Sequence, residues 1–214
     1  IILYGNLDSK TALSVRVNMK RILIACEFSG IVREAFKKKG WDAWSCDLLP
    51  TEIPGQHIQD DVLKHLDDGW DMMIAHPPCT HLAVSGAAWF HKKQKEQKEA
   101  VAFCEALWNA NIKYIVLENP VGVLSTRSSL GKPTQIIQPY QFGESFQKTT
   151  CLWLKNLPKL VATKIVDKGE FVTFKSGKKM AVWYASLRTK KDRAKIRSRT
   201  FKGIAEAMGE QWTY

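Results

Sequence analysis

The chain has 214 residues, of which 45% are hydrophobic and 25% charged, and these values are ordinary for one globular domain with a sizeable core. No apolar run approaches the roughly 18 residues of a membrane helix, and no secretory signal pattern opens the chain, so we expect a cytoplasmic protein without a membrane partner. The five cysteines include no CxxC pair, which argues against a zinc knuckle or a disulfide framework, and we expect no bound metal.

The net charge of +11 favours an anionic partner, with nucleic acid as the first candidate. The basic residues gather in residues 188–202, where Asp192 is the only acid. We expect three arginines of this segment, Arg193, Arg197 and Arg199, to contact nucleic acid. A solvated basic surface would have the same net charge, so charge alone does not decide between the two interpretations.

The main elements follow one another from residue 21 onward. Residues 1–18 carry no clear pattern and precede Met19, which has the form of a natural start, so we expect a poorly ordered N-terminal extension there. Apolar runs predict strands at 21–26, 41–46, 70–75 and 114–117, and amphipathic stretches predict helices at 31–39, 62–66 and 94–109. This alternation predicts the α/β class, with a doubly wound, mostly parallel sheet.

The pattern is looser after residue 120. It predicts short strands at 136–137 and 149–154, a β-hairpin over 164–185 with its turn at Ser176-Gly177-Lys178, and a last helix over 200–211. We therefore expect a main α/β domain over 19–154, a small β-rich region over 155–195, and a C-terminal helix within 196–214 that returns to the main domain.

Polar residues follow the ends of the predicted parallel strands. Ligands of open α/β sheets bind beyond the carboxyl ends of the strands. The residues expected at this edge are Glu27 to Gly30, Asp47, Asp60, Cys79 and Glu118. Because five such positions in a row meet at one edge, we expect a ligand site there.

Cys79 is the strongest candidate for a reactive group. It follows Pro77 and Pro78, whose rings fix φ and stiffen the turn, and such a turn suits a nucleophile aimed at a substrate. Glu118 lies at an apolar strand end, where burial would raise the pKa of its carboxyl and suit it to general acid work. The ordinary alternatives are a buried structural cysteine and a salt-bridged glutamate. We assign the structural role to the other four cysteines, Cys26, Cys46, Cys104 and Cys151.

Three ordered motifs carry a resemblance to a known family: Cys26-Glu27-Phe28-Ser29-Gly30, His76-Pro77-Pro78-Cys79 with Ser85-Gly86 behind it, and Glu118-Asn119-Pro120. Together they resemble the signatures of the cytosine-C5 DNA methyltransferases over roughly residues 20–125. Each motif alone is weak, whereas the ordered set is fairly specific. The chain is similar to small members of this family that bacteriophages encode. The resemblance implies a Rossmann-like methyltransferase fold and, for a phage protein, the host cytoplasm.

The resemblance also implies S-adenosylmethionine as the cofactor. The methionine end would lie against the first loop and the proline turn, the ribose hydroxyls against the acid after the second strand, and the adenine against the next acidic pair. In that order, these cofactor residues are Glu27, Phe28, Ser29, Gly30 and Pro77, then Asp47, then Asp60 and Asp61.

DNA is the substrate polymer that the resemblance implies. Cys79 would attack C6 of cytosine, while Glu118, beside Asn119, would bind N3 and the exocyclic amine and protonate N3. The base must be flipped out of the duplex, and Ser85 and Gly86 lie in the matching loop. Lys148 would place one positive charge near the base, and residues 155–195 would contact the target.

The chain departs from the family pattern in three respects. Thr80 and His81 follow Cys79 where the family has Gln, the later Gln-x-Arg-x-Arg strand has only Gln147-Lys148-Thr149 as its counterpart, and the recognition region is short. Two other hypotheses therefore stay open. The same chemistry could act on RNA or a free pyrimidine nucleotide, or the chain could be a degenerate homologue that binds nucleic acid without catalysis. We interpret His76 and His81 as turn residues with local hydrogen bonds.

Overall fold

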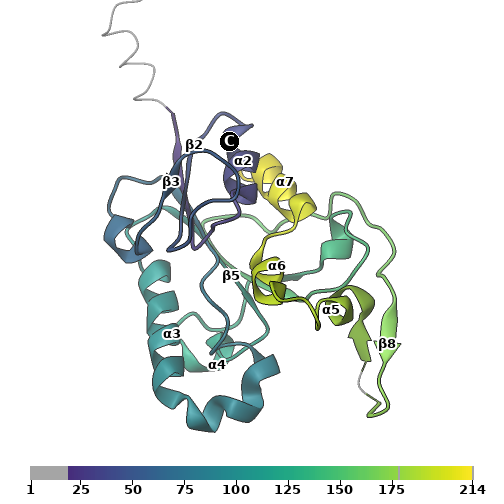
Figure 1. Cartoon of the computed structure of the whole chain (residues 1–214). Coiled ribbons are helices and arrows are strands. Elements are labelled where there is room, and N and C mark those ends of the chain that lie inside the picture. The colour runs from purple at the N-terminus through teal and green to yellow at the C-terminus, as the bar shows by residue number, and fades with distance from the viewer. Residues whose placement is uncertain (1–18, 178, 214) are drawn as a thin grey trace, which may run out of the picture.

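The computed structural model describes residues 19–177 and 179–213, so the predicted extension over residues 1–18 lies outside the described residues. Figure 1 shows a central sheet with helices on both sides and a smaller lobe beside it, which carries β8 and α5. Among the described residues, no helix combines the length and the apolar character that crossing a bilayer requires.

The central sheet has seven strands in the order β3-β2-β1-β4-β5-β7-β6. Neighbours among the first five strands run parallel, whereas β7 is antiparallel to both β5 and β6. The predicted α/β class and mostly parallel sheet are therefore confirmed. The strand order reverses between β1 and β4, which is where ligands bind in such sheets. The strands are β1 (Arg21–Ala25), β2 (Asp42–Cys46), β3 (His57–Ile58), β4 (Met72–Ala75), β5 (Tyr114–Pro120), β6 (Gln135–Ile137) and β7 (Thr150–Lys155).

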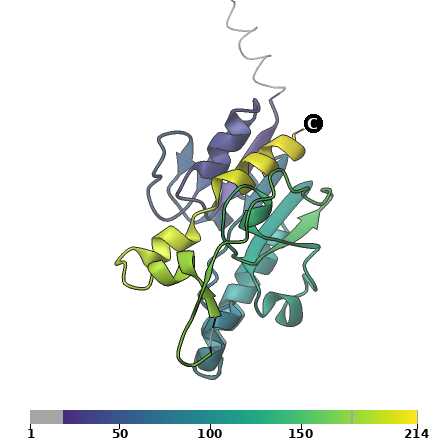
Figure 2. The ribbon, with the colours of Figure 1, turned by 90° about the vertical axis from the view of Figure 1, so that its right-hand side faces the viewer.

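Helices cover both faces of this sheet. Alternate side chains of β1 point to opposite faces, so Ile22 and Ile24 pack in the cluster that contains α2 and α7, while Leu23 and Ala25 pack in the cluster that contains α3. Figure 2 shows α7 beside α2, which joins the two ends of the described chain. The helices are α2 (Ile31–Lys37), α3 (Gln94–Trp108), α4 (Leu124–Arg127), α5 (Val182–Ser186), α6 (Arg193–Ser198) and α7 (Lys202–Gln211), and the 3-10 helices are η1 (Val62–His65), η2 (Val84–Lys92) and η3 (Pro139–Gln141).

The smaller lobe holds a two-stranded antiparallel hairpin, β8 (Phe171–Thr173) and β9 (Lys179–Ala181). The prediction continued this hairpin to Ala185, whereas residues 182–186 form α5. The pairing ends where Phe171 meets Ala181, so the residues that follow have no neighbouring strand. Trp183 instead stacks on Phe146, with ring centroids 4.5 Å apart and planes 8° from parallel.

Strand β5 is longer than predicted and carries the third motif inside it. The sequence predicted its end at Leu117, which is where pairing with β4 stops. On the other edge, β7 continues to pair with Glu118, Asn119 and Pro120. Glu118 is therefore held in a strand by its neighbour Leu152 and is not a free loop residue.

Candidate active site

The first loop of the site connects β1 to α2. Its two bends have left-handed backbone, with φ of 58° at Cys26 and 74° at Gly30. The buried carboxylate of Glu27 accepts hydrogen bonds from Val32 N at 2.8 Å and Arg33 N at 3.2 Å, so it caps the start of α2. The Ser29 hydroxyl donates to the same carboxylate at 3.0 Å. Both side chains are thus used to fix the loop.

A small pocket lies against this loop. Its walls are Cys26 to Ser29 and His76, and its roof is Ser198 and Thr200 from the basic segment near the C-terminus. The cavity measures about 10 Å³, which is room for about one water molecule. Sites for small organic ligands are of the order of 300–1,000 Å³. A ligand of that size therefore requires the roof to move.

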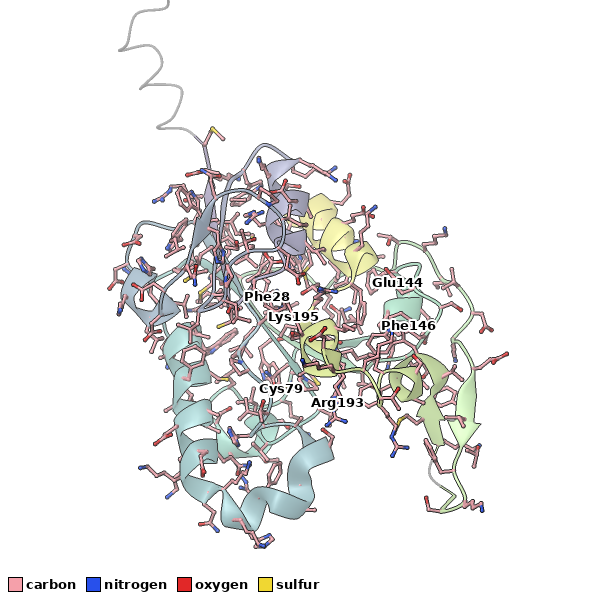
Figure 3. The ribbon with its side chains drawn as sticks, viewed as in Figure 1. Phe28, Cys79, Glu144, Phe146, Arg193 and Lys195 are labelled. Atoms are coloured by element: carbon pink, nitrogen blue, oxygen red, sulfur yellow. The ribbon has the colours of Figure 1, made fainter. Side chains whose placement is uncertain are left out.

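One acidic residue, Glu52, and one aromatic residue, Phe28, hold the roof in place. The carboxylate of Glu52 accepts hydrogen bonds from Arg199, from Nε to Oε2 at 2.8 Å and from Nη2 to Oε1 at 2.6 Å. Nζ of Lys195 lies 2.9 Å from the same Oε1. Lys195 Nζ also lies 5.4 Å from the ring centroid of Phe28, and Figure 3 shows these two residues together. The loop that carries Glu52 is itself anchored on the fully buried Arg33, which donates to the carbonyl of Ile53 at 2.5 Å.

The proline turn that begins at His76, in the pocket wall, ends at Cys79. The carbonyl of Cys79 accepts hydrogen bonds from the amides of Leu82 and Ala83, both at 3.0 Å. Asn119 is 1% exposed and donates from Nδ2 to the carbonyl of Pro77 at 3.0 Å. Asn119, predicted as catalytic, therefore ties the turn to β5 and positions Cys79.

A second tie joins the loop after Cys79 to the loop after β5. Ala83 and Gly122 form an isolated antiparallel bridge, and Val123 N donates to the carbonyl of Leu82 at 2.9 Å. A Cβ on Gly122 would lie 2.2 Å from that carbonyl oxygen. Only glycine allows the two loops to approach this closely.

Glu118 points from β5 toward the same turn. Its Oε2 lies 3.2 Å from Nδ1 of His76, and the two side chains are 22% and 6% exposed. Burial raises the pKa of Glu118. The hydrogen bond and charge of His76 and the charge of Lys148 together lower this pKa by more than burial raises it, so the net shift is downward. The sequence predicted a raised pKa, so on this point the prediction was wrong, because it missed these two partners.

Cys79 and Glu118 belong to one electrostatic cluster with Lys148 and Arg197. The pKa of Cys79 is raised, first by burial and then by the charge of Glu118, while the two basic side chains oppose that rise. Burial lowers the pKa of Lys148, which Glu118 and Cys79 counteract. Lys148 also donates from Nζ to the carbonyl of Arg197 at 2.7 Å. The cluster thus pairs a thiol with a carboxylate and a buried ammonium.

The other predicted cofactor acids follow β2 and β3. Asp47 comes directly after β2 and accepts a hydrogen bond from Leu49 N at 2.9 Å. Asp60 pairs with Lys64 at 2.8 Å, and this hydrogen bond with that of the Asp61 amide lowers its pKa to about 2. Asp61 caps η1 by accepting from Leu63 N at 3.0 Å. All three carboxylates therefore already have local partners.

The predicted nucleic-acid contacts are placed unequally. Ser85 is exposed and Gly86 lines a second cavity of about 70 Å³ beside Thr80 and His81. Arg193 is exposed, whereas Arg197 stacks on Tyr184 with its guanidinium 4.2 Å from the ring centroid. Arg199 is neutralised by Glu52. Among the described residues, Arg193 has no acidic or aromatic partner, and its Nη1 donates to the carbonyl of Arg188 at 3.4 Å.

His76, Glu52 and Arg33 are the site residues that sequence reasoning missed. His76 was interpreted as a turn residue with local hydrogen bonds, but its partner lies 42 residues away. The available signal was its place at the end of β4, next to the strand that carries Glu118. Glu52 and Arg33 carried no comparable signal, because their partners are set by loop geometry. Within residues 19–177 and 179–213, no group of three metal-ligating side chains is found.

The remaining cysteines differ from Cys79 in that no basic side chain opposes the rise in their pKa. Cys46, Cys104 and Cys151 are buried, and Cys26 is partly buried. Burial raises the pKa of each thiol, to about 12 for Cys104 and about 11 for Cys46. Thiols of this kind stay protonated and unreactive at neutral pH.

Comparisons with known proteins give one match to report. No family model matches the sequence, and no curated protein matches it. Among solved structures, the chain is similar to one from E. coli that is described, provisionally, as a DNA modification methyltransferase encoded within a prophage. The TM-score is 0.48 and the identity 13%, over 69% of this chain and 52% of that chain. The chain thus spans about half the length of that protein.

Proposed function

We propose that the chain transfers a methyl group from S-adenosylmethionine to C5 of cytosine in DNA, through a covalent bond between Cys79 and C6 of the base. The observation that carries this proposal is the cluster of Cys79, Glu118 and Lys148 at the carboxyl edge of the sheet, which His76, a residue of the pocket wall, joins through its contact with Glu118. A thiol, a carboxyl and a cation around one space are the groups that addition to a pyrimidine ring requires.

Two features suit the proposed cofactor. Asp47, the acid proposed for the ribose hydroxyls, precedes Leu48 in the chain, and Leu48 is 72% exposed, so an apolar side chain is available near that acid. His76, which lines the pocket, has a buried nitrogen with no partner among the described residues, and this suits a polar ligand. When bound, S-adenosylmethionine supplies an electrophilic methyl group. Its methionine end would lie against Phe28, Ser29 and Gly30, beside Glu27 and Pro77, and its adenine near Asp60 and Asp61.

The chemical step begins with the thiol. As Sγ of Cys79 forms its bond to C6, the electrons of the C5–C6 double bond become available at C5, and negative charge develops toward N3. Glu118 places a proton at N3, and Lys148 offsets the charge. After C5 has received the methyl group, the C5 proton passes to water, Sγ leaves C6 as a thiolate, and N3 returns its proton to Glu118, which restores the aromatic ring. Transfer of that proton from Glu118 to Sγ regenerates the resting thiol and carboxylate.

The charge states of the free site match this sequence of steps. In the resting site Cys79 holds a proton, because its pKa is raised, and Glu118 lacks one, because its pKa is lowered. The reactive form needs the opposite arrangement, a thiolate and a carboxylic acid. Both forms contain the same number of protons, because the one proton that Cys79 loses is the one that Glu118 gains. Binding of the base then drives an internal exchange without uptake from solvent.

DNA is the proposed polymer because of the charge of the chain and of its basic segment. Arg193 is exposed, and the net charge of +11 attracts phosphate. Ser85 and Gly86 would then face the strand from which the base is flipped. The lobe that carries β8 and α5 would contact the flanking duplex, in the region proposed for target contact over residues 155–195.

The proposal is tested with duplex DNA that contains 5-fluorocytosine, because fluorine at C5 cannot leave as a proton and the Cys79–C6 bond persists. Purified chain with S-adenosylmethionine should form a covalent protein–DNA complex whose crosslinked peptide contains Cys79. The Cys79→Ser variant should form none, while Cys104→Ser, which changes a buried thiol, serves as the matched control. A crosslink that forms with RNA or dCMP but not with DNA would show that the substrate is RNA or a free nucleotide. Failure of all three, with no 5-methylcytosine in unmodified DNA, would overturn the proposal.

A further inference from the structure

His76 occupies the wall between the pocket and Glu118. Its side chain is 6% exposed, and its Nδ1 lies 3.2 Å from Oε2 of Glu118. Its own amide donates to the carbonyl of Ala25 at 2.9 Å, which fixes the end of β4 against the end of β1. The ring is thus held between two strands at the point where the strand order reverses.

The second ring nitrogen has a different environment. Nε2 of His76 is buried and has no hydrogen-bond partner among the residues that the structure describes. His76 is also one of the residues that line the pocket with Cys26 to Ser29. A buried polar atom without a hydrogen bond is unfavourable, so such an atom in a residue of the pocket wall indicates that a group bound in the pocket pairs with it.

The contact to Glu118 determines which ring nitrogen is left for the ligand. A carboxylate accepts hydrogen bonds, so Nδ1 donates to Glu118 and Nε2 is the nitrogen that faces a further partner. The methionine end of the proposed cofactor carries an ammonium donor and a carboxylate acceptor, so it offers Nε2 a partner in either charge state of the ring. The ring therefore has one nitrogen for the carboxyl that faces the base and one for the ligand of the pocket.

We propose that His76 is a positioning residue that holds Glu118 through Nδ1 and forms a hydrogen bond with the bound cofactor through Nε2. This inference rests on the proposed function for the identity of the ligand. The part of the inference that concerns Nδ1 and Glu118 rests on the geometry of their contact alone. The other titratable or charged groups that face Glu118 are Cys79, Cys151 and Lys148, so a pH effect of His76 must be separated from theirs.

Two substitutions test the roles of Nδ1 and Nε2 of His76 separately. His76→Asn keeps a donor near the Nδ1 position and removes Nε2, whereas His76→Gln keeps a polar group near the Nε2 position and removes Nδ1. Binding of S-adenosylhomocysteine, measured by calorimetry, should weaken by about tenfold or more in His76→Asn and by less in His76→Gln. The kcat of methyl transfer should fall more in His76→Gln. His91→Gln, an exposed histidine in η2, is the control. Equal losses in both variants would overturn the inference.

The contact to Glu118 is tested without cofactor or DNA, through the reactivity of Cys79. Without Nδ1, burial dominates at Glu118, the carboxyl neutralises more readily, and the pKa of Cys79 falls. His76→Gln should therefore speed alkylation of Cys79 by iodoacetamide at pH 7, by about tenfold for each unit of that fall, as measured by mass spectrometry of its peptide. His76→Asn should react more like the wild type.

A Glu118→Gln background separates charge from loosening. With no carboxylate present, His76→Gln should add no further increase in alkylation, and an equal increase there would show that the substitution merely opens the turn and would overturn the inference. If the wild type methylates DNA but the two His76 variants show equal losses of S-adenosylhomocysteine affinity and of kcat, the inference is rejected and the proposed function stands. A wild type that binds no S-adenosylhomocysteine rejects the cofactor and the Nε2 half together, and alkylation still decides the Nδ1 half.

Discussion

Arg199 donates two hydrogen bonds to the carboxylate of Glu52, which lies 147 residues earlier in the sequence, at 2.8 Å from Nε and 2.6 Å from Nη2. The pair joins the loop after β2 to the residues that follow α6, and Ser198 and Thr200 on either side of Arg199 form the roof of the pocket. Ligand entry requires this roof to move, so the ion pair sets part of the barrier to entry.

Glu52→Gln should therefore speed ligand entry. Exposed pairs contribute about 0–1 kcal/mol, so the association rate of S-adenosylhomocysteine, followed by stopped-flow tryptophan fluorescence, should rise by up to about fivefold. Amide exchange of residues 195–200 should rise with it. Glu210→Gln, which breaks an exposed pair with Lys39 away from the pocket, is the matched control. An unchanged or slower association rate would contradict a roof held by Glu52.

Acid should release the same roof. The hydrogen bond from Arg199 lowers the pKa of Glu52, opposed by slight burial and aided by Lys195. A carboxyl with a lowered pKa stabilises the closed roof above its ordinary range, near pH 4, and that contribution is lost as the pH falls through the lowered value. Amide exchange of residues 195–200, corrected for its intrinsic pH dependence, should therefore rise below about pH 4 in the wild type. In Glu52→Gln it should already be high and change little.

The pH dependence of methyl transfer should have a wide plateau. The resting and reactive forms of the Cys79–Glu118 pair hold the same number of protons, so their ratio is constant between the two pKa values. Since the pKa of Glu118 is lowered and that of Cys79 raised, kcat/KM should fall only below the ordinary range of a glutamate and above that of a cysteine. A narrow optimum near pH 7 would contradict this pairing.

Lys148 should support the alkaline side of that plateau. Its charge lowers the pKa of Cys79, so Lys148→Met should raise that pKa and slow alkylation of Cys79 at pH 8. Glu118→Gln should do the reverse. Lys95→Met changes a lysine whose side chain is 88% exposed and should leave alkylation unaffected. A faster reaction in Lys148→Met would show that the buried ammonium acts on Cys79 by packing rather than by charge.

The sequence predicted most of the fold because its signals were local. Runs such as Ile22 to Ala25 bury both faces, and Gly40 marked the turn after α2, although the helix ends at Lys37, two residues before its predicted end. The continuation of β5 past Leu117 was missed because it depends on β7, a strand that begins only at Thr150. The helix at Val182 was missed because residues such as Trp183 and Tyr184 favour strands, and only the stack on Phe146 decides otherwise.

The site was predictable as a set of residues and not as a set of contacts. The order of the motifs placed Phe28, Cys79 and Glu118 at one edge, which is where they lie. The charge state of Glu118 was predicted with the wrong sign, because the partners that set it come from other strands. The basic segment was identified by composition, but composition does not show that Glu52 neutralises Arg199. Charge counts predict a partner more readily than they predict which charges are available.

Gly122→Ala should disable the site through the loop tie. The added Cβ would lie 2.2 Å from the carbonyl oxygen of Leu82, so the loop after Cys79 must move away. Overpacking of this kind typically costs about 1–3 kcal/mol of unfolding free energy, measurable by urea denaturation. The displacement of Cys79 should lower methyl transfer by more than the stability loss explains. Val121→Ala, at an exposed position in the same loop, is the control, and equal activity of the two variants would contradict the tie.

Arg193 and Arg199 should differ in their contribution to DNA binding. Arg193 is exposed and its charge is available to a phosphate, whereas the charge of Arg199 is taken up by Glu52. Arg193→Gln should weaken DNA affinity almost equally for all sequences and reduce the slope of log K against log salt by about 1. Arg199→Gln should change that slope much less, because it removes a cation that already has an anion. Fluorescence anisotropy over a salt series measures both, and equal slopes for the two variants would show that Arg199 leaves Glu52 when DNA binds.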